Sequence, residues 1–553
     1  MPAFTSLKFI PWLPLVILGA SLGYALSILT RLPWWSSFIV TFLWVGVSVK
    51  LRWGHASDSR YRRVWPWSLA PLILWGIYVY LAASFGNVDL AAIFFHLQAG
   101  IAEHGGIGRM VAAVLHTAAM LALLASFIWL VRHDSRWRLL ERFLAVVLLV
   151  ANPLLYGLGQ RSAVIVTDDG AWLDRRYVPP QLEKQPSPPN LLLIYLESLE
   201  RTYTNQEHFG DTYADLAALG EQGVVFEGIQ QVENTGWTMA GMIASQCGVP
   251  LMPAGLLHDR QFEPLARVVP GVSCLGDLLA EQGYEMSFLG GASTQFAGKG
   301  LFYSGHGFSN VLGREALEPR LEDATYLNSW GLYDDSLYDF TLEEIRRLDT
   351  MDGPWGVVNL SITSHAPHGY PAQACVDPLG EFDGVDILYS VKCSAWLATD
   401  LIERLRQEGL LENTVVVVAS DHLTMRVPVW DQLVSLDRDN TLIMFGDSLE
   451  PRRIQRNATT MDVFPTILEA LGYSLEEGRA GIGVSLLQDS TQTLLEKHGP
   501  ETLAEKLHAE RALQERLWEG LEPQQLANEG EATVPQQVLE TLADRADEIS
   551  ISR

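Results

Sequence analysis

The chain has 553 residues, 48% of them hydrophobic, and carries a formal net charge of -26 at pH 7. This length exceeds that of one ordinary domain. The acidic balance argues against nonspecific binding to nucleic acid, so no nucleic-acid partner is expected. Apolar and acidic residues are segregated, because the first third is rich in Leu, Val, Ala and Trp and most acids lie further along. We therefore predict a membrane part followed by an acidic soluble part.

Residues 1–160 are predicted to form an α-helical membrane domain of about five transmembrane helices. Most of its apolar stretches approach the roughly 20 residues that span a bilayer; they are residues 12–29, 34–49, 67–83, 111–131 and 143–158. The first stretch could instead be a signal peptide, but no convincing small-residue cleavage site follows it. Basic loops at residues 50–63 and 132–142 indicate a cytoplasmic N-terminus, which places the later chain on the outer side of the lipid bilayer.

Residues 190–198 begin a different kind of chain, after a juxtamembrane connector at residues 161–189 that ends in a polar, Pro-rich spacer. An apolar run stops abruptly at Glu197, which is the pattern of a buried strand that delivers a carboxylate to the edge of a sheet. Strand and helix patterns then alternate over residues 190–490. This alternation predicts an α/β domain with a largely parallel sheet covered by helices on both faces, in which sites form at the carboxyl ends of strands.

Six strands and six helices are predicted within this domain. The strands are residues 191–196, 224–226, 286–289, 355–362, 414–419 and 441–445. The helices are residues 211–222, 238–245, 274–282, 336–348, 389–408 and 461–471. The remaining residues, 491–553, are rich in acids and are predicted to form a solvated helical extension, with helical runs at residues 501–521 and 535–549.

The four cysteines all lie outside the apolar third, and none belongs to a CxxC pair that would indicate a zinc knuckle. If the α/β domain is exported, Cys247 with Cys274 and Cys375 with Cys393 are candidate disulfides. The alternative is four separate buried thiols.

Asp421 and His422 directly follow a fully apolar strand. Uncompensated burial of both side chains would be unfavourable, and a divalent cation would compensate it. A carboxylate oxygen and a neutral imidazole are ligands that suit zinc or manganese. The alternative is that Asp421 caps the next helix and that His422 has no role.

Thr238 lies where a Gly-containing turn meets a short apolar helix. A hydroxyl at a helix N-terminus is near unpaired backbone N–H groups, which favour a phosphate. Attack by a hydroxyl on phosphorus requires activation, and direct coordination to a metal would provide it. The alternative is that Thr238 only caps the helix.

Two further groups follow strand ends. His365 and His368 come after the predicted strand at residues 355–362, and either could donate to a phosphoryl oxygen or bind a metal. Alternatively, both could be surface loop residues. Glu200 follows Glu197 by three residues, and we expect it to support the site rather than to act in it.

Glu197, Thr238, a Ser-His-x-Pro segment that contains His365, and the Ser420-Asp421-His422 run together resemble the alkaline phosphatase/sulfatase superfamily. The closest likeness is to its membrane-anchored branch, which includes lipoteichoic acid synthases and phosphoethanolamine transferases. Within that branch, several segments are similar to the phosphoglycerol transferases that decorate osmoregulated periplasmic glucans. These segments are residues 195–203, 238–250, 296–300, 304–308, 330–335 and 420–423.

The resemblance implies roles for individual residues. Glu197, Asp421 and His422 would bind one divalent metal ion, which is manganese, zinc or magnesium. Thr238 would be both a fourth ligand and the nucleophile. His365 would hold the phosphate or the leaving group, and Trp330 would line the pocket for the glycerol phosphate. His368 receives no role, because its segment matches the family only loosely.

The resemblance also implies an activity and a location. Phosphoglycerol would pass from phosphatidylglycerol to a periplasmic glucan or another glycan through a covalent threonine intermediate, with release of diacylglycerol. The protein would lie in the bacterial inner membrane, with its catalytic domain in the periplasm.

Three other functions compete with this interpretation. Phosphoethanolamine transfer to lipid A or a glycan would use the same metal and nucleophile. A sulfatase-like or phosphodiester hydrolase is disfavoured, because no Cys/Ser-x-Pro/Ala-x-Arg run stands at Thr238. A non-enzymatic membrane sensor or scaffold with a phosphatase-like fold would be expected to have lost a ligand, and none of the four candidates is lost.

Overall fold

The computed structural model describes residues 170–253, 267–380 and 384–520. Within these ranges, the helices lack the combined length and apolar character that crossing a bilayer requires. The five predicted transmembrane stretches and the helical run at residues 535–549 lie outside the described residues. The membrane domain, its topology and its location therefore stay predictions.

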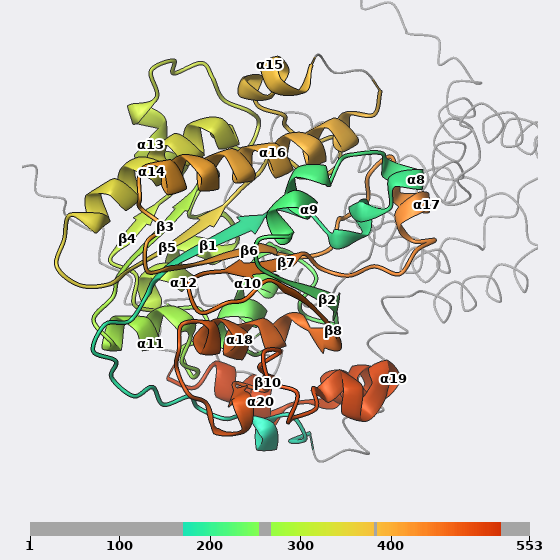
Figure 1. The fold of residues 1–553 in the computed structure, drawn as a ribbon. Helices are drawn as coiled ribbons and strands as arrows, with labels where there is room; N and C mark the ends of the chain where they lie inside the picture. The colour runs from blue at the N-terminus through green and yellow to red at the C-terminus, as the bar shows by residue number, and fades with distance from the viewer. Residues whose placement is uncertain (1–169, 254–266, 381–383, 521–553) are drawn as a thin grey trace, which may run out of the picture.

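One eight-stranded sheet organises the domain, with strand order β4-β3-β5-β1-β6-β7-β2-β8 (Figure 1). β7 runs antiparallel to its neighbours β6 and β2, and the other neighbouring pairs are parallel. The predicted largely parallel sheet is confirmed. The strands are β1 (Asn190–Leu196), β2 (Val224–Gln230), β3 (Glu285–Gly290), β4 (Asn310–Leu312), β5 (Trp355–Leu360), β6 (Thr414–Ser420), β7 (Leu442–Phe445) and β8 (Arg452–Thr459).

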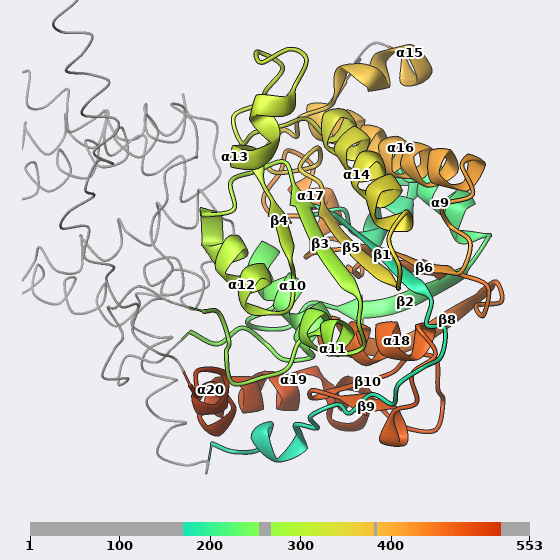
Figure 2. The same cartoon turned by 90° about the vertical axis from the view of Figure 1, so that its left-hand side faces the viewer.

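Helices cover both faces of the sheet, as the sequence predicts (Figures 1 and 2). Successive side chains of β1 and β6 point to opposite faces and enter two separate apolar cores, which is why the central residues of both strands are apolar without alternation. On one face lie α9 (Ala214–Gly220), α14 (Asp334–Asp349) and α16 (Asp386–Gln407). On the other lie α10 (Thr238–Cys247), α11 (Leu275–Glu281), α12 (Lys299–Gly305) and α18 (Val463–Ala470).

All six predicted strands and all six predicted helices occur near their expected positions. The predicted strand at residues 355–362 is two residues too long, because the chain leaves the sheet after Leu360. β4 and β8 were not predicted. β4 has only three residues, and β8 is an edge strand whose exposed, Arg-rich first half carries no apolar run.

Both candidate disulfides are present. Cys247 at the end of α10 is bonded to Cys274 just before α11, and Cys375 is bonded to Cys393 on α16. The first belongs to the core on the α10 face and the second to the core on the α16 face. Each face of the sheet is therefore tied by one covalent link.

The predicted solvated character of the C-terminal extension is wrong for the part that the structure describes. Two helices, α19 (Leu494–Ala509) and α20 (Ala512–Leu517), pack onto the domain (Figure 2). Their apolar side chains join the core on the α10 face, and Trp518 Nε1 donates to the carbonyl of Met252 at 2.8 Å. The acids dominate the composition, but the Leu residues on these helices form a buried stripe.

The described part of the connector, residues 170–189, also contacts these helices. Glu510 accepts a 2.7 Å hydrogen bond from the backbone N–H of Leu173, and Arg516 pairs with Asp174 at 2.6 Å. Residues 170–189 and 494–518 are therefore parts of the packed domain, which extends beyond the predicted range of 190–490 on both sides.

This packing makes a test possible with one pair of variants. Leu513→Ala empties a fully buried site and should lower the free energy of unfolding by about 2–5 kcal/mol. Glu515→Ala, on the exposed side of the same helix, should change it by less than about 0.5 kcal/mol. Thermal or urea unfolding of the full chain in detergent measures both. If both substitutions changed the free energy of unfolding by the same small amount, the result would contradict the packed arrangement and favour the predicted solvated extension.

Candidate active site

Neighbouring strands deliver the candidate ligands to one edge of the sheet. β1 pairs in parallel with β6, with Leu196 opposite Ser420, so the residues that follow these two strands emerge side by side. Those residues are Glu197 and Asp421. On the other side of β1, Ser361 follows β5, and its hydroxyl accepts a 3.0 Å hydrogen bond from the backbone N–H of Glu197. Both carboxylates therefore lie at the carboxyl ends of parallel strands, where the sequence predicts site residues.

His422 lies between the two carboxylates. Its Nε2 is 3.3 Å from Glu197 Oε1 and 3.4 Å from Asp421 Oδ2. Among the described residues, Glu197, Asp421 and His422 offer ligand atoms that all lie within 4.8 Å of one another, and all three side chains are buried. The structure thus brings together the three residues that the sequence proposed as metal ligands.

Thr238 faces this cluster from the first turn of α10. Its Oγ1 donates to Glu197 Oε2 at 3.4 Å. The helix cap position belongs to Trp237, so Thr238 is not the N-cap residue that the alternative interpretation required. Gly241, one turn further on, allows α10 to approach so closely that a Cβ there would lie 1.7 Å from the Asp421 carbonyl oxygen. The close packing of α10 on the Asp421 loop positions Thr238 beside the cluster.

The three buried groups perturb one another's pKa values. Burial and the neighbouring charge of Glu197 raise the pKa of Asp421 to about 8. Burial lowers the pKa of His422, but the charges of Asp421 and Glu197 outweigh it and raise the value to about 9. Burial also opposes ionisation of Glu197, yet His365 and His422 hold its pKa well below the usual range. The cluster therefore contains two carboxylates, and the one imidazole can supply at most a single positive charge to balance them.

The hydrogen bonds around the cluster suit a divalent cation. His422 Nδ1 lies 2.8 Å from the Leu423 carbonyl and can donate to it, so a cation that replaced the proton on Nε2 would meet a lone pair directed toward the carboxylates. Backbone N–H groups of Ser198 and His422 both donate to Asp421 Oδ1, at 2.8 and 2.9 Å. Asp421 Oδ2 and His422 Nε2 are buried without a hydrogen-bond partner. Carboxylate oxygen, imidazole nitrogen and the Thr238 hydroxyl fit the donor set of a zinc or manganese site.

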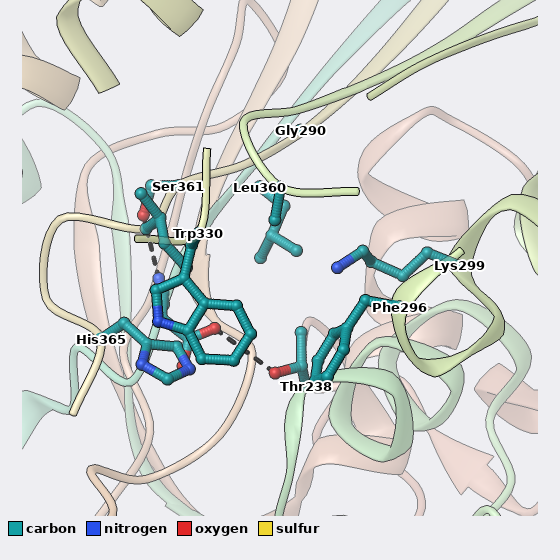
Figure 3. A pocket seen from close by; sticks show the side chains of 11 residues that line it. Thr238, Gly290, Phe296, Lys299, Trp330, Leu360, Ser361 and His365 are labelled. Carbon is teal, nitrogen blue, oxygen red and sulfur yellow. Dashed lines mark hydrogen bonds between the residues drawn. The ribbon is translucent and has the colours of Figure 1, made fainter. Parts of the chain in front are cut away.

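A small pocket opens beside Thr238 (Figure 3). Trp330 and His365 form one wall, with ring centroids 4.6 Å apart. Phe296 packs edge-on against Trp330, with ring centroids 5.2 Å apart, and Lys299 lies on the far side of Phe296. His365 Nδ1 lies 2.7 Å from the Ala366 carbonyl. The lining residues are Glu197, Thr238, Gly290, Ala292, Phe296, Lys299, Trp330, Leu360, Ser361, Ile362 and His365. Trp330 and His365 thus lie beside the candidate nucleophile, where the resemblance places them.

Lys299 is a site residue to which the sequence analysis assigned no role. Ala297 and Gly298 both have positive φ, of 57° and 71°, and this sharp turn starts α12 with Lys299 directed into the pocket (Figure 3). Its Nζ lies 5.0 Å from the centroid of the Phe296 ring. Burial lowers the pKa of Lys299 to about 8, although Glu197, Glu315 and Asp421 raise it. The sequence feature that could have identified Lys299 is the presence of a lysine within a mostly apolar segment.

Two other candidates stand apart from the pocket. Glu200 is buried and accepts hydrogen bonds from Arg438 and from the Thr424 backbone N–H, so it supports the loop after His422, as expected. His368 is exposed and does not line the pocket, which agrees with the surface-loop interpretation for this residue.

Asp334 is a supporting residue that the sequence analysis missed. It follows the Trp330 segment and accepts backbone N–H bonds of 2.7–3.0 Å from Ile362 and Thr363, which lead to His365. It therefore ties the segment of Trp330 to the segment of His365. Burial raises the pKa of Asp334 to about 6, although hydrogen bonds from Thr363 and Ile362 lower it.

Together, the fold and the site define a class, namely α/β domains that gather a hydroxyl, two carboxylates and an imidazole at the carboxyl ends of parallel strands. The family model described as Sulfatase matches residues 189–473, and the chain belongs to this family.

Curated relatives give a more particular likeness. Phosphoglycerol transferase I of Escherichia fergusonii is 31% identical over 433 residues, which cover 74% of this chain and 56% of that protein. The protein of the same name from Xanthomonas axonopodis pv. citri is 31% identical over 437 residues, covering 74% and 61%. The chain thus spans less than two thirds of the length of these relatives. A solved alkaline phosphatase superfamily protein from Vibrio parahaemolyticus matches with a TM-score of 0.46 and 22% identity, covering 61% of this chain and 78% of that one.

The donor set predicts metal-dependent stability. Mn²⁺, Zn²⁺ or Mg²⁺ should raise the melting temperature of the chelator-treated protein. With the metal at 100 times its Kd, the free energy of unfolding should increase by about 2.7 kcal/mol. Asp421→Asn should abolish this response, and Asp400→Asn, on the exposed side of α16, should leave it intact. An unchanged response in the Asp421→Asn protein would contradict the assignment.

Asp334 predicts a pH dependence of stability. Its folded pKa of about 6 exceeds the ordinary value of 3.8, so its stabilising contribution is full below about pH 4 and is lost as the pH rises through 6. The stability difference between wild type and Asp334→Asn should therefore shrink by about 3 kcal/mol from pH 4 to pH 7, since each pKa unit corresponds to about 1.4 kcal/mol. Chemical denaturation at several pH values measures it, and a constant difference would contradict the prediction.

Proposed function

We propose that this protein transfers phosphoglycerol from phosphatidylglycerol to a periplasmic glucan or another glycan. The observation that carries the proposal is the position of Thr238, whose hydroxyl lies 3.4 Å from Glu197 at the start of a helix and opens into the pocket. The names of the curated relatives support phosphoglycerol as the transferred group.

Glu197, Asp421 and His422 would hold one divalent cation, with Thr238 as a fourth ligand. Such a cation would lower the pKa of the Thr238 hydroxyl and polarise a phosphoryl oxygen. The hydroxyl lies in the first turn of α10, where backbone N–H groups and the helix dipole favour the negative charge of a phosphate.

The reaction would proceed by two displacements at phosphorus. Thr238 Oγ1 loses its proton and forms a bond to phosphorus, while the bond from phosphorus to the diacylglycerol oxygen breaks. That oxygen takes up one proton, and diacylglycerol leaves. A glucan hydroxyl then loses its proton and attacks the phosphorus of the glycerophosphoryl-threonine, and the Thr238 oxygen leaves and regains one proton. Splitting the transfer into two steps replaces one difficult reaction by two easier ones.

The pocket residues would orient the reacting group. His365 would donate a hydrogen bond to the phosphoryl oxygen or to the leaving oxygen, because it lines the same pocket as Thr238. Lys299 would add positive charge near the phosphate. Trp330 would contact the glycerol. A lipid donor is consistent with the predicted membrane domain and with a location in the bacterial inner membrane.

The nucleophile can be tested directly. Thr238→Ala should reduce transfer from head-group-labelled phosphatidylglycerol to a glucan by at least about 10³-fold, because the covalent route is lost. Thr238→Ser should keep a measurable rate, and only it and the wild type should accumulate labelled protein when the acceptor is omitted. Full transfer by the Thr238→Ala protein would exclude the covalent threonine.

A further inference from the structure

We propose that Lys299 determines which head group the pocket accepts, favouring the uncharged glycerol of a phosphoglycerol group over the ammonium of a phosphoethanolamine group. This inference rests on the proposed function and deepens it, because it identifies the residue that separates two transferases with the same nucleophile and metal ligands. The inference is argued from the charge and the position of the buried Lys299 side chain.

The retained head group must lie close to Lys299. In the proposed reaction diacylglycerol leaves first, and the head group stays attached to Thr238 through phosphorus. Thr238 lines the pocket together with Phe296, Trp330 and Lys299 (Figure 3). A head group attached to Thr238 would therefore lie against these three side chains.

The pocket lining suits an uncharged group better than a cation. Glu197 is the one acidic residue among the lining residues, and it is a candidate metal ligand. Glu315, which influences Lys299, does not line the pocket and accepts hydrogen bonds from Ser293 and Thr294. An ethanolamine ammonium would thus enter a buried space that already holds the Lys299 amine and contains no carboxylate other than the candidate metal ligand Glu197.

Lys299 cannot easily move away from such a ligand. The residue is only 3% exposed, so its side chain is enclosed by the surrounding protein. The positive φ values of Ala297 and Gly298 set its direction, and its amine lies over the Phe296 ring. The Phe296 face is therefore already occupied by a cation, and Trp330 packs against both Phe296 and His365, so the aromatic rings offer little room for cation–π binding of a second ammonium.

Transfer by the full-length protein in mixed vesicles tests this inference. The donor is head-group-labelled phosphatidylglycerol or phosphatidylethanolamine, and the acceptor is a glucan. The wild type should favour phosphatidylglycerol by at least about tenfold. Lys299→Met, which keeps the length of the side chain but removes its charge, should slow transfer from phosphatidylglycerol and reduce the preference by about tenfold. Lys299→Arg should retain the preference, and Lys392→Met, on the opposite face of the sheet, should match the wild type.

Binding measurements separate this inference from the proposed function. Calorimetry with the Thr238→Ala protein should show tighter binding of glycerol 1-phosphate than of phosphoethanolamine, and adding Lys299→Met should remove the difference. A preference that is equally strong with lysine and methionine, in a variant whose melting temperature is normal, overturns the role of Lys299. Loss of transfer from both lipids by the wild type, with the Lys299-dependent binding preference intact, overturns the proposed function instead.

Discussion

The site depends on burying two carboxylates and an imidazole at the ends of two paired strands. Ionised groups so far from water are stable only when opposite charge and hydrogen bonds accompany them. The chain supplies part of this through backbone N–H groups on Asp421 Oδ1 and a carbonyl beside His422 Nδ1. The remaining buried atoms, Asp421 Oδ2 and His422 Nε2, face each other at 3.4 Å, an arrangement that a shared cation would stabilise.

The loops around this cluster are held by polar residues that take no part in ligation. Glu200 fixes the loop after His422 through Thr424 and Arg438, and Asp334 joins the segments that carry Trp330 and His365. Such supports matter because a site displaced by about an ångström loses much of its reactivity. The opposite wall, with Lys299, is positioned instead by the backbone turn at Ala297 and Gly298.

The sequence allowed the sheet and the metal-ligand candidates to be predicted, because both follow from local patterns. An apolar run that ends in an acid marks a central strand and its functional end, and this rule located Glu197 and Asp421. Thr238 and His365 were candidates from their positions at a helix start and after a strand, but only the family resemblance favoured them over a cap and a surface loop. Trp330 was proposed from the resemblance alone. Lys299, Asp334 and Gly241 were missed because their roles arise from turns and close backbone approaches between distant segments. The buried stripe of α19 and α20 was obscured by the surrounding acids.

The parallel sheet has a consequence for the order in which the site can be assembled. Ser198 and Asp421, which join the loops after β1 and β6, are 223 residues apart in the chain. β6 is inserted between β1 and β7, so these loops meet only after most of the domain has been synthesised. A partly synthesised chain that ends before β6 would carry Thr238 and Lys299 but could not pair Glu197 with Asp421 and His422. Metal loading would accordingly be a late event that reports on completed folding.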